Sequence, residues 1–196
     1  MENIPGKVVE GGSGSILAAV SRLPHEPDVI INNYGYNHLS WIGTTQEEDE
    51  RILMINVMGP YWVINHVKAF WGGPCRVINI ASQTHRVPQR CTTLYSASKA
   101  ALVQMTKVMS RELAPEGWVI NAVSPGKITD TSMSKQTDAQ VRVLRGWDQM
   151  EANSYALSNV PMRRFTSREE IAEVVVQVLG LPDYVNGTVI EAHGGI

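Results

Sequence analysis

Short runs of apolar residues alternate along this chain with amphipathic stretches of helical period. Continuous apolar runs bounded by turn residues are typical of parallel strands that are buried on both faces of a sheet. The runs that fit this pattern are Lys7–Val9, Asp28–Asn32, Arg76–Ala81, Trp118–Val123 and Thr188–Ala192. Because helical stretches separate them, the pattern predicts a parallel sheet with helices on its faces.

The stretches between the runs predict the covering helices. Helical periodicity extends over Ile16–Leu23, from Gln46 to about Phe70, over Leu94–Leu113 and over Ser167–Leu179. Ser167 is a suitable N-cap for the last of these, and Glu170 three residues on completes a capping box. Residues 131–160 mix polar and apolar positions without a firm period, so we expect an irregular, partly helical lid over a ligand crevice. With no internal repeat or linker, residues 1–196 are expected to form one domain.

Composition and charge narrow the class of protein. The chain has 196 residues, 43% hydrophobic and 18% charged, with a formal net charge of −2, as in ordinary soluble domains. That balance does not favour nucleic acid or an anionic membrane as a partner, and no apolar run reaches the ~20 residues that span a bilayer. Cys75 and Cys91 lie outside any metal-binding spacing, so no metal site is expected. Without a signal-peptide pattern, they indicate reduced thiols in a cytoplasm.

One pair of residues carries candidate chemistry. Tyr95 and Lys99 are four residues apart, which places them on the same face of the predicted helix. A phenol titrates near pH ~10 in isolation, and a neighbouring ammonium favours the phenolate and lowers that pKa. Tyr95 beside Lys99 would then exchange a proton with a carbinol or carbonyl oxygen. On spacing alone, however, most such pairs are solvated side chains on a helix surface.

The strand ends add polar residues to this pair. Ser82 directly follows the run Arg76–Ala81, at the carboxyl end of a strand, where open α/β sheets bind their ligands. The segment from Asn32 to Gly35 ends the preceding strand, and Ser124 to Ile128 ends the next one. Asn56 lies inside an apolar helical stretch, where it either caps a local kink or holds a water molecule.

Six motifs occur in a fixed order along the chain: Asn32-Asn33-Tyr34-Gly35, then Asn56, Ser82, Tyr95-x-x-x-Lys99, Pro125-Gly126, and a last strand ending in Gly194-Gly195. In this order and spacing the chain resembles the short-chain dehydrogenase/reductase family of the classical type, over residues 28–195. The resemblance implies a three-layer, Rossmann-like, doubly wound parallel sheet. It also implies an NAD(P)-linked oxidoreductase that interconverts a carbonyl and an alcohol.

The family's roles fall on matching positions of this sequence. Tyr95 would be the general acid/base, Lys99 would lower its pKa and hold the nicotinamide ribose, and Ser82 would orient the substrate carbonyl. Asn56 would hold a water in a proton relay that reaches Lys99. The residues implied to bind NAD or NADP are Gly11, Gly14, Asn32, Gly35, Tyr95, Lys99, Pro125, Gly126, Ile128 and Thr129. The substrate pocket is expected to include Gln83, Trp147 and Met150.

The nucleotide-binding part of the family pattern is shortened here. Family members open with a strand, a Thr-Gly-x-x-x-Gly-x-Gly turn, a helix and a further strand-helix-strand run before the strand that ends at Asn32. In one alignment Lys7–Leu23 is that first strand, turn and helix, and Gly11 matches the first glycine. In the other, Lys7–Leu23 is the remnant of the strand and helix that directly precede Asp28. Either alignment leaves a sheet of roughly five strands, shortened at its N-terminal side.

Two functions therefore stay open. The first is an NAD(P)-linked oxidoreductase acting on a small carbonyl or alcohol. The second is a degenerate relative that has lost dinucleotide binding and binds a ligand or partner, or uses Tyr95 for a non-redox proton transfer. The shortened sheet would expose an edge, which favours association, and the resemblance implies a homodimer or homotetramer.

Overall fold

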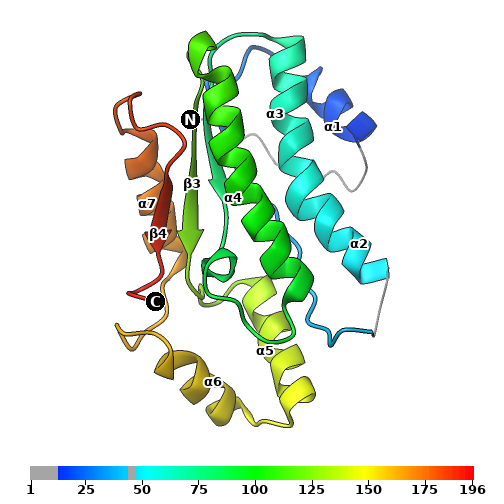
Figure 1. The fold of residues 1–196 in the computed structure, drawn as a ribbon, viewed down its shortest axis with the longest axis vertical. Coiled ribbons are helices and arrows are strands. Elements are labelled where there is room, and N and C mark those ends of the chain that lie inside the picture. The colour runs from blue at the N-terminus through cyan, green and yellow to red at the C-terminus, as the bar shows by residue number, and fades with distance from the viewer. Residues whose placement is uncertain (1–12, 44–46) are drawn as a thin grey trace.

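The computed structural model describes residues 13–43 and 47–196, which form a parallel sheet flanked by helices (Figure 1). The sheet has the strand order β1-β2-β3-β4, and every neighbouring pair is parallel. Its strands are β1 (Val29–Asn32), β2 (Arg76–Ile80), β3 (Val119–Pro125) and β4 (Val189–Ala192). The predicted parallel α/β sheet is confirmed, and the run Lys7–Val9 that would add a fifth strand lies outside the described residues.

The helices follow the predicted periodicity with two differences. They are α1 (Ser13–Val20), α2 (Glu47–Leu53), α3 (Gly59–Phe70), α4 (Thr93–Leu113), α5 (Ser132–Arg145), α6 (Gln149–Ser158) and α7 (Arg168–Leu179). Between α2 and α3 the chain continues as a π-helical segment, Met54–Met58, where a regular helix was expected. The mixed segment 131–160 forms two separate helices, α5 and α6, rather than irregular structure.

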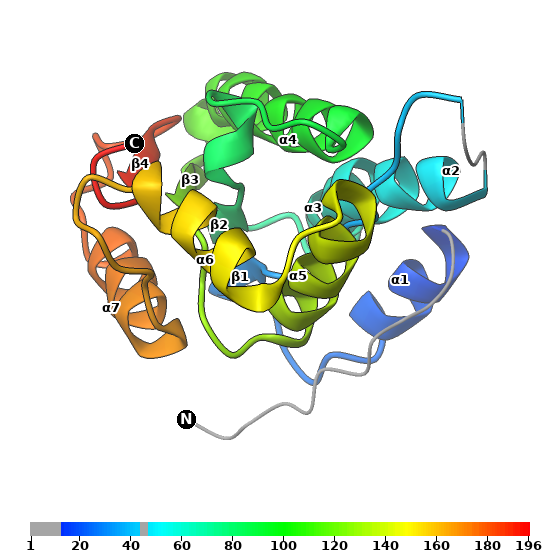
Figure 2. The same ribbon diagram turned by 90° about the horizontal axis from the view of Figure 1, so that it is seen from below.

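Apolar side chains on the two faces of the sheet build two separate cores. Val77 of β2 packs in a cluster with residues of α1, α3 and α4, whereas its neighbour Ile78 packs with α7. This alternation follows from the period of a strand, which turns successive side chains to opposite faces. Figure 2, seen from below, shows α4 and α3 on one side of the sheet and α7 on the other. The three-layer arrangement implied by the resemblance is confirmed.

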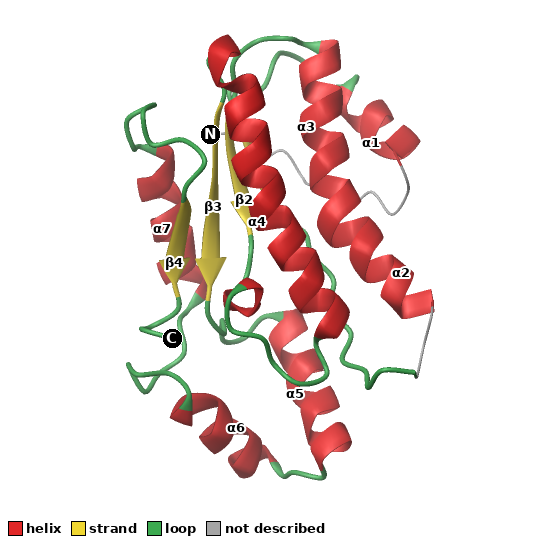
Figure 3. Cartoon of the chain, in the orientation of Figure 1, coloured by secondary structure: helices red, strands yellow, loops and turns green. Residues whose placement is uncertain are grey.

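The helices α5 and α6 lie beyond the carboxyl ends of the strands instead of covering a face (Figure 3). Local sequence sets their limits. Thr131 caps α5 by accepting a hydrogen bond from the Ser134 amide, and Gly146 ends it with a positive φ of 67° that favours glycine. Asp148 and Glu151 then form the capping box that begins α6. These two short helices therefore stand over the edge where the motif residues gather.

Strand β1 forms one edge of the sheet among the described residues. Its outer side chains Val29 and Ile31 are 41% and 47% exposed. Within the described ranges, no helix is both long and apolar enough to cross a membrane.

Candidate active site

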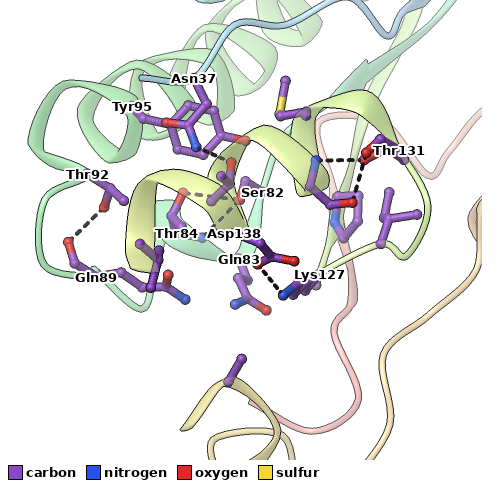
Figure 4. A pocket seen from close by; sticks show the side chains of 18 of the residues that line it. Asn37, Ser82, Gln83, Thr84, Gln89, Thr92, Tyr95, Lys127, Thr131 and Asp138 are labelled. Carbon is purple, nitrogen blue, oxygen red and sulfur yellow. Dashed lines mark hydrogen bonds and ion pairs between the residues drawn. The ribbon is translucent and has the colours of Figure 1, made fainter. Parts of the chain in front are cut away.

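The motif residues converge on one cavity of about 450 Å³ at the carboxyl ends of β1, β2 and β3. Ser82 follows β2, and Tyr95 and Lys99 lie in the first two turns of α4; all three line the cavity. Figure 4 shows Ser82 and Tyr95 among the side chains around this space. Three of the four predicted catalytic residues thus meet in one site, as their order along the chain predicted.

Two hydrogen bonds from Thr84 leave the Ser82 hydroxyl able to donate its proton into the cavity. Its oxygen accepts hydrogen bonds from the Thr84 amide at 3.3 Å and from the Thr84 hydroxyl at 3.1 Å. A serine hydroxyl has two acceptor lone pairs and one donor, so both lone pairs are engaged. The Ser82 O–H can then only donate, and Tyr95 lines the same cavity. Behind it, His85 Nδ1 lies 2.7 Å from the Ser82 carbonyl oxygen, which fixes the backbone at this point.

Lys99 lines the cavity and is only 4% exposed. Its Nζ donates to the Ile80 carbonyl oxygen at 2.8 Å and lies 5.9 Å from the centre of the Tyr95 ring. Burial disfavours the charged ammonium and lowers the pKa of Lys99 to about 8. The side chain therefore holds a proton that is easily exchanged near neutral pH.

The pKa of Tyr95 departs from the expectation. Lys99 was expected to lower it, but burial raises the pKa of the Tyr95 phenol, and the hydrogen bond with Ser82 opposes this rise only in part. Loss of solvent dominates, because Lys99 Nζ donates to the Ile80 carbonyl and lies 5.9 Å from the centre of the Tyr95 ring. In the protein alone, Tyr95 is therefore a neutral phenol at physiological pH, that is, an acid rather than a base.

Asn56 lies behind the cavity and supports it. It is completely buried in the π-helical segment. Its Oδ1 accepts from the Tyr36 amide at 2.8 Å, and its Nδ2 donates to the Tyr36 carbonyl at 2.8 Å and to the Ser98 hydroxyl at 2.9 Å. Of the two interpretations drawn from the sequence, the local kink is the one that this arrangement matches, because Asn56 lies in a π-helical turn. Such turns are frequent at functional sites. Asn56 thereby ties the loop after β1 to the helix that carries Tyr95.

The glycine of the first motif shows how closely these parts approach. A Cβ placed on Gly35 would lie 3.4 Å from both Asn56 Oδ1 and Lys99 Nζ. Gly126, after β3, is tighter still, because a Cβ there would lie 3.1 Å from Gln83 Oε1 and 3.1 Å from the backbone of His193. Both glycines line the cavity, together with two other residues expected to bind the cofactor, Pro125 and Ile128.

Of the remaining predicted cofactor residues, the three that the structure describes do not line the cavity. Asn32 donates instead to Asn79 Oδ1 at 2.8 Å, below the site. Thr129 bonds to the Thr166 carbonyl through its amide at 3.0 Å. Gly14 lies in α1, which packs against α3, and Gly11 lies outside the described residues.

Of the three residues expected in the substrate pocket, one lines the cavity and two do not. Gln83 lines the cavity at 9% exposure. Met150 is 76% exposed on α6, and Trp147 packs against Tyr155 with ring centres 5.0 Å apart; neither lines the cavity. The segment 131–160 instead lines it with other residues, among them Met133, Ser134, Thr137, Asp138, Tyr155 and Ala156.

Two features of the cavity were not found from the sequence. Asn37 lines it at 8% exposure, and the strand-end rule that singled out Gly35 two residues earlier would have located it. Lys127 Nζ lies 2.6 Å from Asp138 Oδ1 and 4.6 Å from the centre of the Phe165 ring. This pair joins the loop after β3 to α5, and only the fold brings the two residues together.

Comparison with known proteins identifies the family of the chain. A family model described as enoyl-(acyl carrier protein) reductase matches residues 14–196. The chain is 30% identical over 176 residues to the 3-oxoacyl-(acyl-carrier-protein) reductase FabG of Aquifex aeolicus, covering 86% of this chain and 65% of that protein. It is also 30% identical over 173 residues to galactitol 2-dehydrogenase of Agrobacterium fabrum, covering 86% and 67%.

A solved structure of NAD⁺-bound xylitol dehydrogenase is similar to the fold with a TM-score of 0.85 at 26% identity, covering 94% of this chain and 75% of that one. The chain therefore belongs to the short-chain dehydrogenase/reductase family. It spans about two thirds of the length of the curated relatives that it matches.

Proposed function

We propose that this protein is an NAD(P)-linked oxidoreductase that interconverts a carbonyl and an alcohol, with Tyr95 as the general acid/base. The observation that carries the proposal is the Ser82 hydroxyl, whose two lone pairs are engaged by Thr84, so that its proton is left for an acceptor in the cavity that Tyr95 also lines. A carbonyl oxygen placed there would accept hydrogen bonds from both hydroxyls. The alternative of a ligand-binding or non-redox relative lacks an observation of this kind in its favour.

The residues around the cavity fit the nicotinamide end of the cofactor. At Gly35 and Gly126 the absence of a side chain lets neighbouring groups of the cavity wall approach to 3.1–3.4 Å from where a Cβ would lie, so a larger residue would displace them. Lys99 carries three N–H donors, of which one is used on Ile80, and the others suit ribose hydroxyls. When bound, the cofactor supplies or accepts the hydride at the reacting carbon. The names of similar structures, an NAD⁺-bound xylitol dehydrogenase and a polyketide ketoreductase with NADPH, support either dinucleotide.

In the direction of reduction, the chain's own residues supply orientation and the proton. Ser82 donates to the carbonyl oxygen and polarises it, while Tyr95, kept neutral by burial, donates its proton to the same oxygen. The phenolate left behind is stabilised by the positive charge of Lys99, whose Nζ lies 5.9 Å from the centre of the Tyr95 ring. In the direction of oxidation Tyr95 must first lose its proton, so alcohol oxidation should rise with pH while carbonyl reduction does not.

Two further features are part of the proposal. Helices α5 and α6 supply much of the cavity lining and act as its lid. The exposed outer side chains of β1 favour a homo-oligomer, which light scattering on the purified protein would detect as a multiple of the 21.6 kDa chain.

The test is a calorimetric titration with NAD, NADP and nicotinamide mononucleotide, followed by an assay of NAD(P)H consumption with carbonyl compounds. We expect one dinucleotide to bind, and Tyr95→Phe to lower turnover by about 10²- to 10⁴-fold. Tyr184→Phe, which changes an exposed tyrosine outside the cavity, is the matched control and should keep the activity. Binding of none of the three nucleotides would eliminate the redox proposal and leave non-redox proton transfer by Tyr95.

A further inference from the structure

The backbone of Ser82 is anchored by the side chain of His85. Ser82 is in an extended conformation at the start of a short 3₁₀ turn, Gln83–His85. The ring Nδ1 of His85 lies 2.7 Å from the Ser82 carbonyl oxygen, and the His85 amide donates to the same oxygen at 3.1 Å. Because a carbonyl oxygen can only accept, Nδ1 carries the proton of this contact. The same turn carries Thr84, whose amide and hydroxyl orient the Ser82 side chain (Figure 4).

The other nitrogen of the His85 ring faces Glu191 of β4. His85 Nε2 lies 3.3 Å from Glu191 Oε1, and the two side chains are only 13% and 25% exposed. With protons on both ring nitrogens, this contact is an ion pair, and its burial strengthens it relative to pairs on the surface. The register of β3 and β4 pairs Glu191 with Ser124, whose Oγ lies 3.3 Å from His85 Nδ1. The His85 ring is therefore held between the end of β4 and the Ser82 carbonyl.

Glu191 is in turn flanked by a second histidine. His193 Nδ1 accepts a hydrogen bond from the Ile196 amide at 3.0 Å, so the proton of a neutral His193 ring lies on Nε2. This nitrogen lies 3.4 Å from Glu191 Oε2, and neither atom has a hydrogen-bond partner among the described residues. The carboxylate thus lies between two imidazole rings, and its place on β4 determines where the His85 ring is held.

We propose that Glu191 is a positioning residue for the reaction at Ser82: it holds the His85 ring, and the ring fixes the turn from which the Ser82 hydroxyl donates into the cavity. This inference rests on the proposed function, since it concerns the same site. Neither Glu191 nor His85 lines the cavity, so they act on the reaction through Ser82. A hydrogen bond to the substrate oxygen matters most when negative charge develops there. Displacing the turn should therefore lower kcat and leave KM nearly unchanged.

Two variants of Glu191 test its link to His85 in the reduction of ethyl acetoacetate by a reduced nicotinamide dinucleotide. Glu191→Leu removes the contact at similar side-chain size and should lower kcat about 10-fold with KM within about twofold of its original value. Glu191→Gln can donate an amide N–H to Nε2 of a neutral ring, whose Nδ1 proton then stays on the Ser82 carbonyl, so it should keep most of the activity. Glu173→Leu, an exposed position of α7, is the control and should change neither constant.

Two variants of His85 test its link to Ser82. The amide nitrogen of asparagine can take the place of Nδ1, so His85→Asn keeps the donor to the Ser82 carbonyl. Glutamine reaches towards Glu191 but leaves that carbonyl without the side-chain donor, so kcat should be about 10-fold lower in His85→Gln than in His85→Asn. Thermal melting curves establish that each variant is folded. An unchanged kcat in Glu191→Leu, or a rise in KM without a fall in kcat, overturns the inference.

NMR of protein labelled with ¹⁵N-histidine separates this inference from the proposed function, because it needs no turnover. The Nδ1–H signal of His85, assigned by its loss in His85→Asn, should be protected from solvent exchange in the unmodified protein and in Glu191→Gln. In Glu191→Leu it should exchange rapidly. Equal protection in Glu191→Leu overturns the inference whether or not a carbonyl is reduced. Protection lost in Glu191→Leu alone, in a protein that reduces no carbonyl, supports the anchoring of Ser82 and counts against the proposed function.

Discussion

Replacing Lys99 by methionine should make the protein more stable while removing its activity. Lys99 is 4% exposed, and burial lowers its pKa from 10.5 to about 8. At 1.36 kcal/mol per pKa unit, holding the charged ammonium in the folded state costs about 3 kcal/mol at pH 7. Methionine has a similar length and no charge, so the substitution removes this cost.

Part of that gain is lost again, because the Ile80 carbonyl loses the donor that lies 2.8 Å away. An unsatisfied buried carbonyl costs about 1–3 kcal/mol. The net expectation at pH 7 is therefore a stabilisation of about 1 kcal/mol, which corresponds to a rise in Tm of roughly 2–4 °C for a chain of this size.

The pH dependence gives the sharper signature. Between pH 8 and 10.5 an unfolded lysine keeps its proton while folded Lys99 loses it. Because the unfolded state binds more protons in this window, the stability of the unmodified protein rises with pH there relative to the variant. The advantage of Lys99→Met should be greatest below pH 8 and should have turned into a disadvantage, set by the lost Ile80 hydrogen bond, near pH 10.5.

Urea unfolding followed by circular dichroism at several values between pH 7 and 10.5 measures this difference directly. Lys107→Met changes an exposed lysine of the same helix and should show neither effect. A difference in unfolding free energy between Lys99→Met and the unmodified protein that does not change with pH would refute the reasoning, because the penalty would then not arise from a buried charge.

Three other outcomes follow from the structure. Asn56→Ala removes the three hydrogen bonds that hold Tyr36 and Ser98, so urea unfolding should show a loss of about 2–4 kcal/mol; a loss under 1 kcal/mol would contradict the supporting role. Burial raises the pKa of the Cys75 thiol to about 12, so iodoacetamide at pH 8 should modify Cys75 only after the protein unfolds. Rapid modification of Cys75 in the folded protein, detected by mass spectrometry, would count against this. The hydrogen bond from Arg164 lowers the pKa of Glu170 to about 2. The pair therefore contributes to stability above pH 4.5, and this contribution is lost as the pH falls through 2. Acid unfolding of Glu170→Gln should depend less on pH in that window, and acid unfolding curves identical to those of the unmodified protein would argue against the pair.

The fold was largely predictable because its signals are local. Strands such as Arg76–Ile80 are buried on both faces and therefore appear in the sequence as unbroken apolar runs. The order of motifs also placed Ser82, Tyr95 and Lys99 correctly in one site, since parallel strands bring their carboxyl ends to one edge. The π-helical turn around Asn56 left no such trace, because one extra residue in a turn hardly alters the hydrophobic period.

The features that the sequence did not reveal depend on distances between remote segments. The pKa of Tyr95 is raised by burial, which Ser82 opposes, and the spacing of residues along the chain reveals neither. Asn37 and Asp138 enter the cavity through the packing of α5 on the strand ends. Residues of segment 131–160 line the cavity, but Trp147, which precedes α6, packs on Tyr155, and Met150 of α6 is exposed, because the direction of these side chains depends on where the helix begins.

The most direct test of the central claim follows deuterium from a reduced nicotinamide dinucleotide, labelled at both C4 positions, to a carbonyl substrate. With the unmodified protein, mass spectrometry should find deuterium on the carbinol carbon of the product. Transfer should fall to about 1% or less with Tyr95→Phe and persist with Tyr184→Phe, which changes an exposed tyrosine outside the cavity. Transfer that is as fast with Tyr95→Phe, or absent from the unmodified protein with the dinucleotide bound, would contradict the account.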